Sequence, residues 1–91
     1  MNKFTFKKGE KRELTAIVNS KNTKDVVVIA SSEYELKKSI DGSIVQKGSC
    51  EIEGNEATVF LDLNQKGKFE LEITSSVGRE VIKSKTTITV E

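Results

Sequence analysis

The chain has no histidine, no proline, no tryptophan and a single cysteine among its 91 residues. Without an imidazole there is no Ser-His or Cys-His nucleophile and no histidine-ligated metal, and one thiol can neither hold zinc nor close an internal disulfide. The absence of proline excludes a polyproline linker. We therefore expect no catalytic residue, no metal site and no cofactor.

Other functional signatures are missing too. The six glycines never form GxGxxG or a phosphate loop that ends in GK[ST]. Glu51 with Glu53, and Glu70 with Glu72, are carboxylates at alternate positions that we expect to face solvent without the cleft of a hydrolase. The N-terminal stretch has no long apolar run, so no signal peptide and no transmembrane segment are expected. These features favour a non-enzymatic protein made in the cytoplasm, with neither a small-molecule substrate nor a membrane partner.

The net charge of +1 gives no overall attraction to nucleic acid or anionic lipid. The charges are nevertheless uneven. Residues 1–25 contain seven Lys or Arg and three Asp or Glu, whereas residues 49–72 contain two and six. This asymmetry has two interpretations, which are solvation of exposed strand faces and head-to-tail contact between copies of the chain.

A basic cluster near the N-terminus is a candidate interaction surface. It consists of Lys3, Lys7, Lys8, Lys11 and Arg12. Only Phe4 and Phe6 interleave with it, and alternation assigns both rings to the core. Because binding of single-stranded nucleic acid needs exposed aromatic rings beside the charge, we expect no nucleic-acid partner. Lysines on an edge strand also hinder aggregation between strands, which favours solvation as their role.

Alternating apolar and polar residues predict a chain of strands. The seven expected strands cover residues 3–6, 12–19, 26–39, 43–53, 57–63, 69–75 and 82–90. No segment has the apolar spacing of a helix, so no significant helix is expected. Each strand is apolar on one side only, and two sheets must face each other to bury these sides. We therefore predict an all-β protein, a two-sheet antiparallel β-sandwich that forms a single domain over residues 1–91.

Turn residues predict where the strands connect. Asp41-Gly42 is typical of a type I′ hairpin turn, and Gly54-Asn55 of another tight turn. Gly48 predicts a bulge within its strand. The stretch "ASS" at residues 30–32 predicts a bulge or bend where the chain passes between sheets.

Three side chains stand out from the pattern. Cys50 alternates with Ile52 and is expected to be a small buried apolar residue. Tyr34, the one tyrosine, is expected in the core. Phe60 is out of phase with its apolar neighbours, so it is either an exposed anchor for a partner or a buried residue at a sheet edge.

Three stretches of the chain resemble the small immunoglobulin-like proteins of tailed phages. They are "FTFKKGEKRELTAIV", "ASSEYELKKSIDGSIVQKGSCEIEGNEATVFLDL" and "KGKFELEITSSVGREVIKSKTTITV". The second half is also similar to the N-terminal domain of phage baseplate upper proteins. One departure is Phe69, where tyrosine is common in the family. The resemblance implies an immunoglobulin-like sandwich of about seven strands, and it carries no functional residue.

The same resemblance implies a function. Such domains are virion components, so we expect a structural or accessory protein of the tail, baseplate or head that docks on other virion proteins or on itself. Docking would use an edge strand, with residues 3–6 and 82–90 as candidates, or the outer face of one sheet. The alternatives are a binding module of a bacterial surface protein and a small phage-encoded inhibitor of a host protein.

Overall fold

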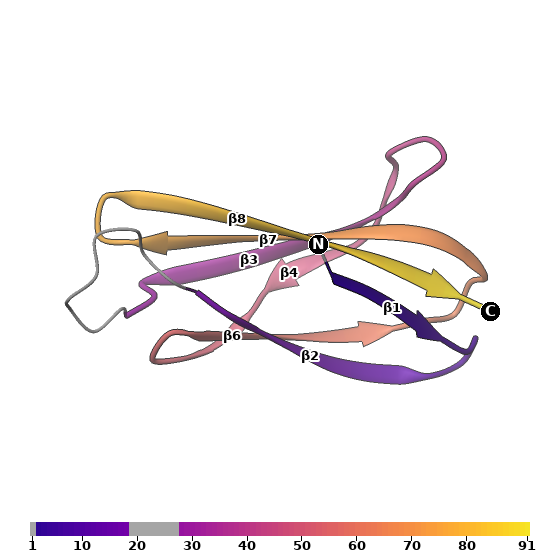
Figure 1. Ribbon diagram of the computed structural model, residues 1–91, viewed down its shortest axis with the longest axis horizontal. Helices are drawn as coiled ribbons and strands as arrows, with labels where there is room; N and C mark the ends of the chain where they lie inside the picture. The colour runs from indigo at the N-terminus through magenta and orange to yellow at the C-terminus, as the bar shows by residue number, and fades with distance from the viewer. Residues whose placement is uncertain (1, 19–27) are drawn as a thin grey trace.

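The computed structural model describes residues 2–18 and 28–91, and in this part of the chain every regular element is a strand. The strands are β1 (Asn2–Phe6), β2 (Lys11–Ile17), β3 (Ser31–Lys38), β4 (Ile44–Ser49), β5 (Glu51–Glu53), β6 (Glu56–Asp62), β7 (Gly67–Val77) and β8 (Glu80–Val90). They form a five-stranded sheet in the order β1-β8-β7-β3-β4 and a three-stranded sheet in the order β2-β6-β5. Figure 1 shows the two sheets as layers. The all-β prediction is confirmed.

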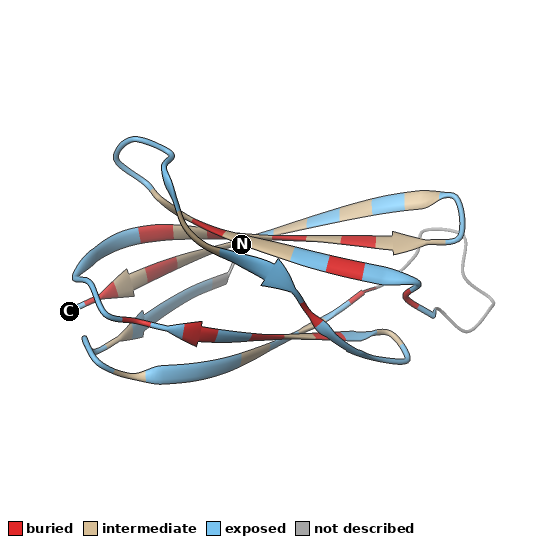
Figure 2. Ribbon diagram, turned by 180° about the vertical axis from the view of Figure 1, so that it is seen from behind, coloured by how far each residue is buried: buried red, intermediate tan, exposed pale blue. Residues whose placement is uncertain are grey.

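The core lies between the layers, as the alternation predicts. In Figure 2 buried and less buried residues alternate along the strands. Leu71 and Ile88 face inward from the five-stranded sheet, Val59 and Leu61 from the three-stranded sheet, and all four are at most 2% exposed. Burying such a side chain fully contributes about 1.5–3 kcal/mol. The two sheets are therefore held together mainly by these inward side chains.

The first and last strands pair in parallel, and this is a departure from the expected fully antiparallel sandwich. The register runs from Asn2 opposite Thr86 to Phe6 opposite Val90. The ring of Phe6 packs on the core, whereas Phe4, stacked on Phe6 at 5.9 Å between centroids, is 37% exposed. The prediction of a core position therefore holds for Phe6 but is only partly right for Phe4, which lies at the rim.

The stretch 43–53 forms two strands, where one was expected. Its first half is β4 in the five-stranded sheet, and its second half is β5 in the three-stranded sheet. The chain changes sheet at Cys50, which is buried, as predicted, and whose N–H donates to the carbonyl of Ser32 at 2.9 Å. Strand geometry continues almost unbroken through the crossing, which is why alternation alone does not reveal it.

The stretch 26–39 is shorter as a strand than expected. Its first two residues lie outside the described residues, and residues 28–30 lie outside β3. The predicted bend is present at Ala30. The Ile29 N–H donates to the Gly54 carbonyl beside the three-stranded sheet, and the Ala30 N–H donates to Ser76 of the five-stranded sheet. The bend therefore brings the chain from one sheet to the other.

The turn at Asp41-Gly42 is not of type I′, because that type needs a positive φ at both central residues. Gly42 has a φ of +71°, but no described residue other than glycine has a positive φ. The connection is a longer loop, closed by hydrogen bonds from Gly42 N to Lys38 O at 2.8 Å and from Lys38 N to Ser43 O at 2.9 Å. The carboxylate of Asp41 accepts from the backbone N and the hydroxyl of Ser43, and these bonds lower its pKa.

The bulge in β4 does not lie at Gly48. The register with β3 shifts between Leu36 and Lys37, which leaves Val45 as the extra residue. Gly48 lies opposite Tyr34, and a Cβ atom there would be 3.3 Å from Tyr34 Cε1. The glycine therefore makes room for the tyrosine ring, which packs against the core.

A side-chain clamp joins the two sheets on the side of β4. The amide of Gln46, from β4, donates from Nε2 to the carbonyl of Asp62 at the end of β6. Its Oε1 accepts from the Asp62 N–H at 3.3 Å. The short β5 pairs with β6 only as far as Thr58, so it does not reach Asp62. The Gln46 amide therefore supplies the backbone hydrogen bonds that a neighbouring strand would make to Asp62.

Candidate interaction surface on the three-stranded sheet

The structure divides the predicted basic cluster among several surfaces. By register, Lys3 lies on the outer face of the five-stranded sheet and Lys11 on the outer face of the three-stranded sheet. Lys7 and Lys8 lie in the turn between β1 and β2. Arg12 has the inward phase of edge strand β2. The five residues therefore do not form one patch on one face.

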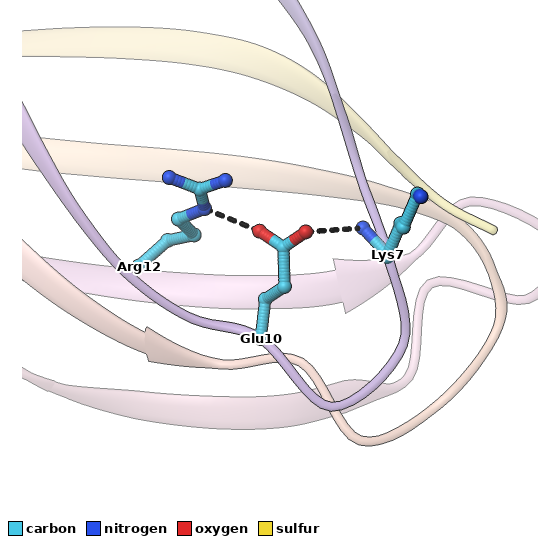
Figure 3. A network of polar contacts seen from close by, with 3 residues as sticks. All are labelled: Lys7, Glu10 and Arg12. Carbon is cyan, nitrogen blue, oxygen red and sulfur yellow. Dashed lines mark hydrogen bonds and ion pairs between the residues drawn. The ribbon is translucent and has the colours of Figure 1, made fainter.

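Two members of the cluster stabilise the turn between β1 and β2 (Figure 3). The guanidinium of Arg12 lies 5.1 Å from the ring centroid of Phe6, and its Nε donates to the carboxylate of Glu10. The same carboxylate accepts the backbone N–H of Lys7 at 3.2 Å. The hydrogen bond from Arg12 is the main reason that the pKa of Glu10 is lowered. Arg12 is thus occupied within its own chain.

Phe60 lies on the outer face of β6, the central strand of the three-stranded sheet, and is 52% exposed. The ring is therefore exposed and is not buried at a sheet edge, while its role as an anchor for a partner stays a prediction. A groove of about 400 Å³ lies beside the ring and is lined by three residues of β2 and three of β6: Lys11, Arg12, Glu13, Phe60, Leu61 and Asp62. Ile17, 62% exposed, has the same outward phase on β2.

Most charged side chains on this face are carboxylates, and two of them, Glu13 and Asp62, lie next to Phe60. The acidic face is named for the exposed outward carboxylates of β2, β5 and β6: Glu13, Glu51, Glu53, Glu56 and Asp62. Glu13 lies directly opposite Phe60 in the register of β2 and β6. Within these three strands, which the structure describes completely, Lys11 is the single basic side chain with the outward phase. The face therefore combines one exposed aromatic ring with an excess of negative charge.

Sequence reasoning found Phe60 and the acidic excess of residues 49–72, but not that Glu13 joins these carboxylates on one face. The signal lies in the turn between β5 and β6, where Glu53 pairs with Glu56 across a two-residue turn. That register gives Glu51 and Glu53 the same outward phase as Phe60. The phase depends on Gly54, whose φ of +59° sets the tight turn.

The outer face of the five-stranded sheet has a different charge pattern. Lys85 on β8 lies 3.6 Å from Glu70 and 3.9 Å from Glu72 on β7. Lys37 and Glu35, both on β3, approach to 3.9 Å. Exposed pairs of this kind contribute about 0.2–1 kcal/mol each. Charges on this face are compensated within β3 and between β7 and β8, so it lacks the single sign of the acidic face.

The described residues contain no group of three or more His, Cys, Asp or Glu side chains placed to hold a metal ion. The Cys50 thiol is buried, and this burial raises its pKa. Residues 2–18 and 28–91 contain no helix with the length and apolar character needed to cross a membrane. The most distinctive surface of the described chain is therefore the acidic face around Phe60.

Comparisons with known proteins report the fold and no function. No protein-family model matches the chain, and no curated protein does. The crystal structure of an engineered protein from a structural genomics consortium is similar, with a TM-score of 0.76 and 9% sequence identity. The superposition covers 99% of this chain but 18% of that one, so the chain spans less than a fifth of that protein. At this identity, the likeness concerns the fold alone.

Proposed function

We propose that the chain is a non-enzymatic docking module with an immunoglobulin-like fold. The observation that carries the proposal is the half-exposed ring of Phe60 on the acidic face, opposite Glu13 and two residues from Asp62. Aromatic side chains near the middle of an interface often supply most of the binding energy, while a polar rim excludes water. At Phe60 the strand is paired with β2, which places Glu13 opposite the ring, whereas β5 pairs with β6 only from Glu56 to Thr58.

The charge of the acidic face defines the partner. A complementary protein would present lysine or arginine side chains around an apolar recess for the ring. Opposite charges accelerate the encounter, and burial of the ring then slows dissociation. The partner in this proposal is another protein, in keeping with the absence of a recognised substrate or nucleic-acid signature in the sequence.

The setting that we propose is the particle of a tailed phage, in its tail, baseplate or head. The resemblance of the turn and strand motifs to the small immunoglobulin-like phage proteins supports this setting. A binding module of a bacterial surface protein and a phage-encoded inhibitor of a host protein are the alternatives. Only the first setting places the chain in purified virions.

Photo-crosslinking from position 60 tests both the setting and the surface. Particles are purified from cells in which Phe60 of the chain is replaced by a photoreactive phenylalanine analogue, and crosslinked proteins are identified by mass spectrometry. The matched control carries the analogue in place of Ile40, which is 91% exposed in the turn between β3 and β4. We expect a second virion protein to be crosslinked from position 60 and not from position 40. Absence of the chain from particles, or crosslinks from position 40 alone, contradicts the proposal.

A further inference from the structure

Strand β1 covers only half of β8 (Figure 1). Their pairing begins at Asn2 opposite Thr86 and runs toward the C-terminus. The stretch Val81–Lys85 has β7 on one side, and no strand among the described residues lies along its other side. An uncovered strand edge presents N–H and C=O groups that can pair with another strand. We call Val81–Lys85 the open edge.

A groove of about 390 Å³ opens beside the open edge, between the two sheets. Its walls include Leu14 and Ala16 from β2, Leu71 and Ile73 from β7, and Phe4 from β1. Leu71 and Ile73 are core residues, at most 5% exposed. An added strand would therefore find an apolar wall for the side chains that it points inward.

Two of the three side chains on the outer face of the open edge are basic, and the third is Val81. Lys83 and Lys85 are exposed and have the outward phase. On the side where β8 already has a neighbour, Lys85 approaches Glu70 and Glu72 of β7. A strand added on the other side would suit these lysines best if its outward side chains were carboxylates, because opposite charges across neighbouring strands are favourable. Pairing of two open edges is disfavoured, because it would bring lysines of both copies together.

We propose that the open edge accepts an extended segment of a partner protein in which apolar side chains alternate with carboxylates. The apolar side chains enter the groove, the carboxylates lie beside Lys83 and Lys85, and the backbone continues the five-stranded sheet. The chain itself shows that β8 accepts such a neighbour, since β7 has this alternation in "FELEIT", residues 69–74. This site is separate from the acidic face and does not depend on Phe60.

The probe is a synthetic, fluorescein-labelled peptide with the sequence of β7, GKFELEITSSV, added to the intact protein. Anisotropy should report saturable binding. A peptide with lysine in place of both glutamates should bind about tenfold more weakly, because two favourable cross-strand contacts become repulsive. The Lys83→Glu/Lys85→Glu protein should reverse this preference. No saturable binding, or the same affinity for both peptides, overturns the proposal.

Two further measurements separate strand pairing from other modes of binding. In an added strand, the N–H groups of every second residue point toward β8. A peptide N-methylated at those residues should not bind, whereas a peptide N-methylated at the intervening residues should still bind. Equal effects of the two methylation patterns overturn the proposal. Backbone amide shifts should change along Val81–Lys85 and at Leu14. Changes in β3 instead would show that the peptide displaces β7.

The Phe60→Ser protein should bind the peptide unchanged, so this site can fail or hold independently of the acidic face.

Discussion

The hydroxyls of Ser32 and Ser75 lie 3.0 Å apart inside an otherwise apolar core. The two residues are opposite each other on β3 and β7, and they are 3% and 1% exposed. Each hydroxyl therefore finds its partner in the neighbouring strand. The pair satisfies two buried polar groups that would be costly alone.

Removal of one of these hydroxyls should destabilise the protein more than its size suggests. We expect Ser75→Ala to lower the free energy of unfolding by about 1–3 kcal/mol, because the Ser32 hydroxyl stays buried without that partner. The double variant Ser32→Ala/Ser75→Ala should lose less than the sum of the two single variants. Urea denaturation of the four proteins measures both quantities. Strict additivity would show that the two hydroxyls act independently.

The Gln46 clamp between the sheets should be worth a measurable part of the stability. Gln46→Ala leaves the N–H and C=O of Asp62 without the amide, and we expect a loss of about 1–2 kcal/mol. The matched control is Gln65→Ala, an exposed amide in the turn before β7. Chemical denaturation compares the two variants. Equal stability of both would mean that water replaces the clamp without cost.

A side chain at position 48 should be tolerated only if Tyr34 is reduced. We expect Gly48→Ala to cost about 1 kcal/mol, because the new methyl lies within 3.3 Å of the ring and the ring must move. In a Tyr34→Leu background the same change should cost markedly less. A thermodynamic cycle of four proteins measures this coupling. A cost that is the same in both backgrounds would locate the strain in the backbone.

The thiol of Cys50 should react slowly in the folded protein. Burial raises its pKa, so less thiolate is present near neutral pH, and reagents also lack access. We expect an aromatic disulfide reagent to modify it far more slowly than a free thiol, and to reach the free-thiol rate in denaturant. Absorbance follows the reaction. Rapid modification of the native protein would show that the crossing between β4 and β5 opens readily.

The turn between β1 and β2 should weaken in acid. The pKa of Glu10 is lowered in the folded state, so its carboxylate contributes stability above the pKa of the unfolded chain, and this is lost as the pH falls through the lower folded value. Glu10→Gln should therefore shift the urea midpoint downward at neutral pH, and this difference should shrink as the pH falls through the lowered pKa of the folded state. A shift that persists in acid would show that charge is not the cause.

The inward faces of the strands were predictable because a period of two is a local property of the chain. Leu71 and Ile73 follow it within β7 and are buried as expected. The sheet change at Cys50 was not predictable, since β4 and β5 are both extended and the residue between them keeps the same alternation. The bulge was assigned to Gly48 because glycine often marks one. In the structure, the glycine instead leaves space for the ring of Tyr34 on the neighbouring strand.

The candidate site was predictable in part. The phase of Phe60 within residues 57–63 indicated an unusual position, and the structure shows that it is exposed. The acidic face needs the register of three strands, which depends on how β2 pairs with β6 far along the chain. The parallel pairing of β1 with β8 is of the same kind, because it joins the two ends of the sequence. Such pairings follow from the packing of the whole domain.

That parallel pairing determines how the protein responds to mechanical force. Tension applied at the two ends of the chain pulls β1 and β8 past each other lengthwise, so the hydrogen bonds between Asn2–Phe6 and their partners bear the load together. The bond from Glu91 N to Phe6 O at 2.8 Å adds to this shear contact. The domain is thus built to resist stretching along its own length, and single-molecule pulling from the two ends would measure that resistance.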